Sequence, residues 1–433
     1  MADVNATDTG AGAKRTATQA PLPRNVKILA AVSFLTDVAS ELVYPLLPLF
    51  LTTTLGVSAA GLGVIEGFAE SVSSLLRLPA GWWSDRSGRR KPLVVVGYTI
   101  AALARPLIGL AQSAGQVLAI RMSDRFGKGI RTAPRDALIA DSVPVEQRGY
   151  AYGVHRGSDN LGAVFGPLIA WAALTYQWAD LRTLFYWTAL PGLLSVIFLI
   201  IFVREGPRPL AAPRVVAAAS VKQETDVDGL PVPALHHEPD QPLGSAFWRM
   251  LAVIFLFTLS LSTDAFLLLR ASQLGVPQAM IPILWAALHV VKSSSSFVGG
   301  AMSDRFGRRP LILAGWGIYG FVYLGFAVAS AEWHAWALFV VYGLYFGFSE
   351  GTEKALVADL APPARRGAAF GWFNAAVGIA ALPASILFGV VWDAYGAEVA
   401  FTMAAGIAAL SSVLFAVLVP AARNGNGQSN AGA

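Results

Sequence analysis

A stretch between two apolar segments of this chain holds a high density of charge. It runs from Arg121 to Asp141 and reads RMSDRFGKGIRTAPRDALIAD. Four of its charged side chains recur at spacings i, i+4, i+7 and i+11, which places them in one stripe along a helix. They are Asp124, Lys128, Arg131 and Arg135. Carboxylate, ammonium and guanidinium groups in one stripe can bind a charged solute, hold a proton or form ion pairs.

Neighbouring apolar spans repeat this design. The spans near 27–51, 60–84 and 149–175 each carry two titratable residues four positions apart: Asp37 and Glu41, Glu66 and Glu70, His155 and Asp159. A charge at the centre of a membrane helix costs about 2.5–3.5 kcal/mol, so these groups must face one another or a water-filled cavity. The residues that we predict to line such a cavity are Asp37, Glu41, Glu66, Glu70, Arg121, Asp124, Arg125, Lys128, His155, Asp159, Asp264, His289, Lys292 and Glu350.

Some of these residues have a more specific predicted role. Carboxylates in a low-dielectric cavity hold protons more readily, so Asp37, Glu41 and Glu70 are candidate proton carriers. His155 and His289 could titrate near neutral pH, but buried, hydrogen-bonded histidines are the equal alternative.

The composition indicates the elements that must position these groups. Of the 433 residues, 55% are hydrophobic and only 14% are charged, whereas soluble domains carry about 25% charged residues. About twelve apolar spans are long enough to cross a hydrocarbon core of roughly 30 Å. They lie near 27–51, 60–84, 93–112, 116–142, 149–175, 183–203, 247–270, 279–302, 310–330, 334–360, 367–392 and 397–420. We therefore predict an all-α polytopic membrane protein.

A polar, proline-rich segment divides these spans into six and six. It covers 204–246 and is predicted to be a cytoplasmic linker. The predicted units are an N-terminal tail at 1–26, a six-helix bundle at 27–203, the linker, a second bundle at 247–420 and a tail at 421–433.

The two halves are repeats of each other. GWWSDRSGRR at 81–90 returns as GAMSDRFGRR at 300–309, and DALIADSVPVEQRGYAYG at 136–153 returns as KALVADLAPPARRGAAFG at 354–371. Both pairs are displaced by nearly the same number of positions, which chance matches would not maintain. Internal duplication of this kind predicts two bundles related by pseudo-symmetry.

These repeated motifs resemble those of the major facilitator superfamily of secondary transporters. Its pattern between the second and third helices is matched by Gly81, Asp85, Arg86, Gly88, Arg89 and Arg90, and again by Gly300, Asp304, Arg305, Gly307, Arg308 and Arg309. Arg125 and Gly129 match its Arg-x-x-x-Gly pattern on the fourth helix. Gly162, Gly166 and Pro167 match part of a fifth-helix pattern found in exporters. The resemblance implies alternating access, with a substrate site between the bundles.

A second set of charges is predicted to form gating contacts near the cytoplasmic ends of the bundles. For Arg135, Asp136, Glu353 and Lys354 in this set, a structural ion pair is an equal alternative. The set comprises Asp85, Arg86, Arg90, Arg131, Arg135, Asp136, Asp304, Arg305, Arg309, Glu353 and Lys354.

The basic residues predict the orientation in the cell membrane. With both termini in the cytoplasm, nearly all basic residues between spans lie on the cytoplasmic side, as the positive-inside rule requires. Only Arg182 and Arg270 lie toward the other side. We expect the partners to be the lipid bilayer, a small solute and protons, and we expect a monomer that binds no nucleic acid.

The remaining motifs favour no enzyme. The chain has no cysteine, which excludes thiolate metal sites and disulfides. It has no P-loop, and its only G-x-S-x-G pattern, at 347–351, lies within an apolar span. We predict no cofactor and no resident metal.

The sequence therefore predicts a transporter of a small charged solute, with an anion or zwitterion favoured. Proton coupling is expected from the cavity carboxylates, and export (as an antiporter) is slightly favoured by the fifth-helix glycines. Multidrug efflux, divalent-metal transport and a non-transporting membrane receptor are the alternatives.

Overall fold

The computed structural model describes residues 22–87, 89–144, 147–205, 242–362 and 365–419. Within these ranges every regular element is helical. The predicted tails and most of the predicted linker lie outside them.

The N-terminal half forms six helical segments. Three of them are continuous helices, and the other three contain breaks. In chain order the elements are α1 (Arg24–Glu41), η1 (Tyr44–Leu46), α2 (Leu47–Leu49), η2 (Phe50–Thr54), α3 (Ala59–Ser87), α4 (Lys91–Leu107), η3 (Ile108–Leu110), α5 (Ala114–Asp141), α6 (Arg148–Thr175), α7 (Leu181–Trp187) and α8 (Ala189–Phe202).

The C-terminal half forms six further segments. They are α9 (Ser245–Ser260) with α10 (Asp264–Gln273), η5 (Gln278–Met280) leading into α11 (Ile281–Phe306), α12 (Arg308–Val328), α13 (Glu332–Leu360), α14 (Arg366–Tyr395) and α15 (Ala397–Leu418). The predicted all-α fold with six segments in each half is confirmed in the described residues.

Two breaks fall beside charged residues. The first segment loses regular α-helical geometry after Glu41, where Pro45 and Pro48 each remove a backbone donor. The seventh segment, predicted as one helix, is interrupted between Ser260 and Asp264, and the Thr263 hydroxyl caps the second part by accepting a hydrogen bond from the Ala265 amide.

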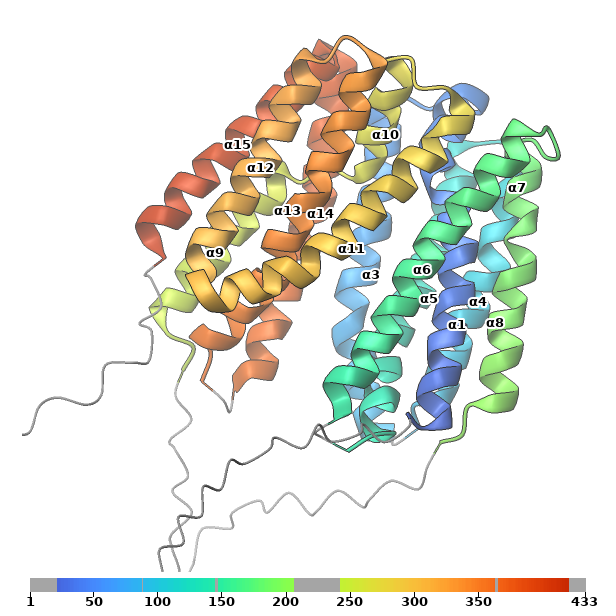
Figure 1. Ribbon diagram of the computed structural model, residues 1–433, viewed down its shortest axis with the longest axis vertical. Coiled ribbons are helices and arrows are strands. Elements are labelled where there is room, and N and C mark those ends of the chain that lie inside the picture. Colours follow the sequence, from blue (N-terminus) through green and yellow to red (C-terminus); the bar gives the residue numbers. More distant parts are fainter. Residues whose placement is uncertain (1–21, 88, 145–146, 206–241, 363–364, 420–433) are drawn as a thin grey trace, which may run out of the picture.

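The two halves stand side by side as separate bundles (Figure 1). The start of α1, the end of α8 and the start of α9 lie toward the lower part of the figure, and α15 runs from the top toward the same side; we call this the terminal end. The opposite end, which carries the starts of α3 and α15, is called the loop end. Between bundles, α3 packs along α14 and α6 packs against α11.

The buried side chains join the bundles unevenly. One hydrophobic cluster combines residues of both halves, including Phe50 and Phe185 from the first and Phe266 from the second. A separate cluster around Val26 and Tyr98 draws only on the first half. The bundles therefore share a core around the break of the first segment, whereas the N-terminal bundle has a core of its own near the start of α1.

Seven described segments are long and apolar enough to cross a membrane by length and composition. Those that miss this threshold are α1, α5, α6, α11 and α13. They are also the helices that carry most of the predicted cavity charges.

Candidate functional site

A polar cavity lies within the N-terminal bundle. The space between its atoms, open solvent included, is about 520 Å³. Its lining comes from α1, η1, α2, α4, η3, α5 and α7: Asp37, Ser40, Glu41, Val43, Tyr44, Leu47, Arg105, Ile108, Arg121, Arg125, Lys128, Arg131 and Phe185.

Helix α5 supplies four of the five cationic side chains because glycines let it lie very close to its neighbours. At Gly97 on α4, an added Cβ would lie 2.6 Å from the Cβ of Arg131. At Gly129 on α5, it would lie 2.7 Å from the Cβ of Leu76 on α3. A larger residue at either position would push α5 away from its neighbours. The glycines therefore fix the depth at which the α5 charges enter the cavity.

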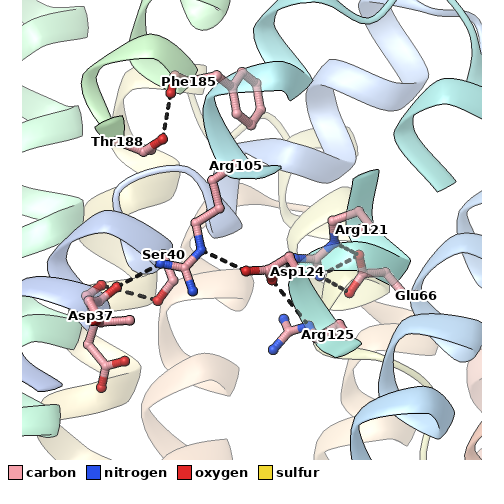
Figure 2. A network of polar contacts seen from close by, with 10 residues as sticks. Asp37, Ser40, Glu66, Arg105, Arg121, Asp124, Arg125, Phe185 and Thr188 are labelled. Atoms are coloured by element: carbon pink, nitrogen blue, oxygen red, sulfur yellow. Dashed lines mark hydrogen bonds and ion pairs between the residues drawn. The ribbon is translucent and has the colours of Figure 1, made fainter. Parts of the chain in front are cut away.

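One buried ion pair joins α5 to α3. The Nε of Arg121 donates to Oε1 of Glu66 at 2.9 Å, and its Nη2 donates to Oε2 at 2.8 Å (Figure 2). Only 6% and 5% of the two side chains are exposed. This two-pronged geometry is the strongest form of guanidinium–carboxylate pairing, so the two charges largely neutralise each other.

A second buried pair joins α5 to α4. The Nε of Arg105 donates to Oδ1 of Asp124 at 2.9 Å, and its Nη1 donates to the Thr36 carbonyl on α1 at 3.1 Å. Figure 2 shows Asp124 between Arg105, Arg121 and Arg125. The other oxygen of Asp124 lies 3.6 Å from Arg121 and 3.9 Å from Arg125. Arg105, which the sequence analysis left out of the cavity, therefore lines it and holds three helices together.

Three cations of α5 stay outside these pairs. Among the described residues Arg125 makes one ion-pair contact, at 3.9 Å from Asp124, and it also interacts electrostatically with Glu66 and Glu70. The guanidinium of Arg131 lies 4.0 Å above the ring of Tyr98, but its Nε and Nη1 are buried without a hydrogen-bond partner among the described residues. Arg131 was predicted as a gating residue, yet it lies in the cavity wall with Arg125 and Lys128.

The carboxylates of α1 face this cationic wall. Asp37 and Glu41 both line the cavity. Glu41 also accepts a hydrogen bond of 2.8 Å from the Trp285 indole on α11, so it links the cavity to the C-terminal bundle. Glu70 lies outside the lining, where it accepts a hydrogen bond from Ser74 at 3.3 Å.

Helix α6 holds the remaining predicted residues of the first bundle. Nδ1 of His155 lies 3.6 Å from Oδ2 of Asp159, and the His155 Nε2 is buried without a hydrogen-bond partner among the described residues. Neither residue lines the cavity.

The predicted residues of the C-terminal bundle form contacts of their own. Tyr342 donates to Oδ1 of Asp264 at 2.8 Å. Lys292 lies 3.9 Å from Glu350 and 3.7 Å from the ring centre of Phe346. The ring of His289 lies 4.9 Å from that of Trp285. The sequence grouped these residues with the α5 charges, but the structure places them outside the N-terminal cavity.

The predicted gating residues form mostly local contacts. Arg135 pairs with Asp136 at 2.9 Å, Lys354 pairs with Glu350 at 3.1 Å, and Glu353 accepts from Trp316 at 2.9 Å. Arg86 lies over Trp82 and Arg305 over Phe306, while Arg309 donates to the Ala416 carbonyl. The side chains of Asp85 and Asp304 lie outside the described part of the structure.

Each half carries an ion pair between a repeated motif arginine and a repeated aspartate that the sequence analysis missed. In the first half Arg90 pairs with Asp141, and in the second Arg308 pairs with Asp359 at 3.2 Å. The two aspartates occupy the same place in the duplicated ALIAD and ALVAD motifs. The repeat aligns Arg90 with Arg309 and Arg89 with Arg308, so the second pair uses the neighbouring arginine of the motif, and only the aspartates could have been predicted from the alignment.

Asp393 is a further residue that sequence reasoning missed, because it follows the predicted span 367–392 by one position. From the end of α14 it accepts hydrogen bonds from the amides of Ala59 at 2.9 Å and Ala60 at 2.8 Å. These amides open α3, where the helix dipole favours an anion. Asp393 therefore connects the two bundles at the loop end.

Among the described residues, no group of three or more histidine and acidic side chains could hold a metal ion. The glycines of α6 lie very close to α1. A Cβ added at Gly162 would lie 2.6 Å from the Phe34 carbonyl oxygen, and one added at Gly166 would lie 2.7 Å from the Leu42 amide nitrogen. These glycines thus serve the packing of α6 on α1.

Comparison with known proteins gives a consistent result. The profile of the Major Facilitator Superfamily matches residues 29–352 and 265–432. The chain is 31% identical over 399 residues to the uncharacterized MFS-type transporter MJ1317 of Methanocaldococcus jannaschii, covering 91% of this chain and 94% of that one. It is 32% identical over 206 residues to the multidrug resistance protein MdtG of Enterobacter lignolyticus, covering 46% and 47%.

Solved structures show the same fold. A POT family transporter in complex with 5-aminolevulinic acid superposes with a TM-score of 0.73 at 13% identity, covering 92% of this chain and 96% of that one. At this identity the likeness concerns the fold. Together with the profile match and the relative that spans nearly the whole chain, it shows that this protein belongs to the major facilitator superfamily of membrane transporters.

Proposed function

We propose that this protein is a proton-coupled secondary transporter that moves a small charged solute by alternating access. The observation that carries this proposal is the N-terminal cavity, where cations of α5 face carboxylates of α1 within a membrane bundle. Charged residues inside a membrane bundle cost free energy, and where they occur they commonly mark a solute or ion pathway. The cavity meets the other bundle through Glu41 and Trp285, as a site between rocking bundles would.

The uneven contact between the bundles supports alternating access. At the loop end, the Asp393 carboxylate of α14 accepts hydrogen bonds from the first amides of α3 and so holds the bundles together. Near the start of α1, the N-terminal bundle has a separate cluster. We propose that the terminal end is cytoplasmic and that the loop-end contacts break when the cavity opens to the outside. The positive-inside distribution of basic residues supports this orientation.

Replacing Asp393 with asparagine should favour the outward-open state. The charge at an exposed helix N-terminus contributes about 0.3–1 kcal/mol, so the population should shift by up to about fivefold. Because the native chain has no cysteine, a single cysteine at the buried Ser385 on α14 can report this. We expect its reaction with an impermeant maleimide to be faster in the Asp393→Asn background. Glu398→Gln at the same end is the control, and equal rates in both backgrounds would contradict a gating role for Asp393.

The carboxylates beside the cations support proton coupling. Asp37, Glu41 and Glu70 stay the candidate carriers, and of these Asp37 and Glu41 line the cavity. Export rests on the fifth-helix glycines alone, and their packing against α1 explains them without reference to direction. Multidrug efflux remains a second candidate because half of the chain is similar to MdtG. The charged lining favours a charged solute over an apolar drug.

Reconstitution into proteoliposomes tests the proposal. The vesicles would contain a pH dye and be challenged with anionic, zwitterionic, cationic and metal solutes. We expect one class to move protons in protein-containing vesicles only, and the direction of proton movement separates symport from antiport. Flux of labelled solute without proton movement would contradict the coupling. No flux of any solute would contradict the transport function.

A further inference from the structure

The cationic side chains in the lining of the N-terminal cavity outnumber the carboxylates in the same lining. Five cationic side chains line it, and two of them, Arg105 and Arg121, are already paired with buried carboxylates. The other three follow one another at i, i+3 and i+6 on α5: Arg125, Lys128 and Arg131. Two carboxylates, Asp37 and Glu41, face them across the cavity, and Glu41 also accepts from Trp285. Glu70 lies outside the lining but interacts electrostatically with Lys128 and Arg125, which leaves Arg131 as the cation with the poorest compensation.

Arg131 shows that an acceptor is missing from this wall. Only 5% of the residue is exposed, and two of its three guanidinium nitrogens are buried with no hydrogen-bond partner among the described residues. Buried donors without acceptors are costly, and charged ones more so. The Tyr98 ring compensates the charge through its face but accepts no hydrogen bond from Nε or Nη1. The site thus lacks a group that accepts several hydrogen bonds and carries negative charge.

We propose that this wall binds the carboxylate or phosphate group of an organic anion, held by Arg125, Lys128 and Arg131. The inference rests on the proposed transport function and names its substrate class. Guanidinium groups present forked donors that suit the oxygens of such groups, and Lys128 adds a point charge.

The rest of the lining suits an apolar body on this anion. Val43, Leu47, Ile108 and Phe185 provide hydrocarbon, and the Tyr44 ring packs 5.2 Å from that of Trp285. Tyr44 thereby touches the C-terminal bundle. An organic anion bound here would lie against the α5 cations with its charged group and against the bundle interface with its apolar part.

The same geometry sets the sign of the proton coupling. Asp37 interacts electrostatically with Lys128 and Arg131 of α5, with Glu41 on α1 and with Asp159 on α6, while Arg105 of α4 binds the adjacent Thr36 carbonyl. An anion that neutralises Lys128 and Arg131 removes the countercharge of Asp37 and adds a like charge. Protonation of Asp37 then becomes more favourable, and by reciprocity a proton on Asp37 favours the anion. The two ligands should bind together, which is symport, opposite to the antiport that the fifth-helix glycines favoured.

Binding by the purified full-length protein tests the substrate class. The probes are benzoate, phenyl phosphate and the cationic benzyltrimethylammonium, measured by calorimetry in detergent. We expect at least one anion to bind and the cation not to bind. Lys128→Gln and Arg131→Gln should each weaken anion binding on the order of tenfold or more, since each removes hydrogen bonds to a charged group. Arg182→Gln, which removes donors to the Gly109 and Ala111 carbonyls outside the cavity, should leave the affinity unchanged.

A pH series tests the sign of the coupling. Benzenesulfonate keeps its charge across the working range, so changes in its affinity report on the protein. Its affinity should rise as the pH falls, and Asp37→Asn should remove most of this dependence. An affinity that falls toward acidic pH would overturn symport. Unchanged anion affinity in both α5 variants, or binding of the cation alone, would overturn the anion site.

These results are separable from the proposed function. Anion binding that responds to the α5 variants, together with silent proteoliposomes, would leave the anion site standing and overturn transport. Proton-coupled flux of cations without anion binding would leave the transport function standing and overturn the anion site.

Discussion

Replacing Glu66 with leucine should lower the stability of the protein more than a change at any exposed carboxylate. The substitution leaves the Arg121 guanidinium buried, with Asp124 at 3.6 Å as its nearest remaining partner. Arg121→Met should destabilise as well, because it leaves the Glu66 carboxylate buried without the hydrogen bonds that Arg121 donates. Removing one partner of a buried ion pair typically costs about 3–5 kcal/mol. We expect a large drop in Tm in detergent and a low yield of monodisperse protein for each variant.

The double variant Glu66→Leu/Arg121→Met tests whether the single variants are unstable because each leaves an unpaired buried charge. Two apolar side chains of similar volume can replace a buried pair at little cost, so much of the lost stability should return. Glu332→Leu at the exposed start of α13 is the surface control, and it should change stability by no more than about 0.5 kcal/mol. If the double variant is as unstable as the sum of the single variants, the ion pair is not what joins α3 to α5.

The overall fold could be predicted from the sequence because its signals repeat. Each span is a run of apolar residues, and the duplicated motifs align the two halves independently of hydropathy. The breaks within the helical segments were harder to predict from the sequence. The interruption between Ser260 and Asp264 depends on capping by one threonine hydroxyl, within a span that is otherwise apolar. The pattern of apolar residues in this span is the same as that of a continuous membrane helix, so it does not reveal the break.

The candidate site could be predicted only helix by helix. Spacing along α5 placed Asp124, Lys128, Arg131 and Arg135 in one stripe, and of these Lys128 and Arg131 lie in the cavity lining, together with Arg121 and Arg125. Spacing alone does not show which neighbouring helix these residues face, because that depends on how α5 packs against the helices around it. Arg105 is a lone charge in its span, and its partnership with Asp124 exists only after packing. For the same reason, the sequence could not show that Asp264 and Glu350 contact residues of the C-terminal bundle and lie outside the N-terminal cavity.

Replacing Asp37 with asparagine should abolish proton-coupled transport while leaving solute exchange intact. The amide mimics the protonated carboxyl and cannot release a proton, so a bound solute can still cross but cannot drive proton movement. In proteoliposomes we expect counterflow of labelled solute to continue and the interior pH signal to disappear. The effect should be close to complete, because Asp37 is the cavity carboxylate that interacts with Lys128 and, within the described residues, forms no ion pair closer than 4 Å.

Glu41→Gln is the matched comparison on the same face of α1. Both residues were predicted as proton carriers, but the structure ties Glu41 to the Trp285 indole across the bundles. A glutamine carbonyl can still accept that hydrogen bond, so Glu41→Gln should keep coupling and change mainly the rate of exchange. Coupling that survives Asp37→Asn and disappears in Glu41→Gln would exchange their roles. Coupling that survives in both variants would move the proton site out of the N-terminal cavity, and Asp264 with its Tyr342 hydrogen bond would then be the next carboxylate to test.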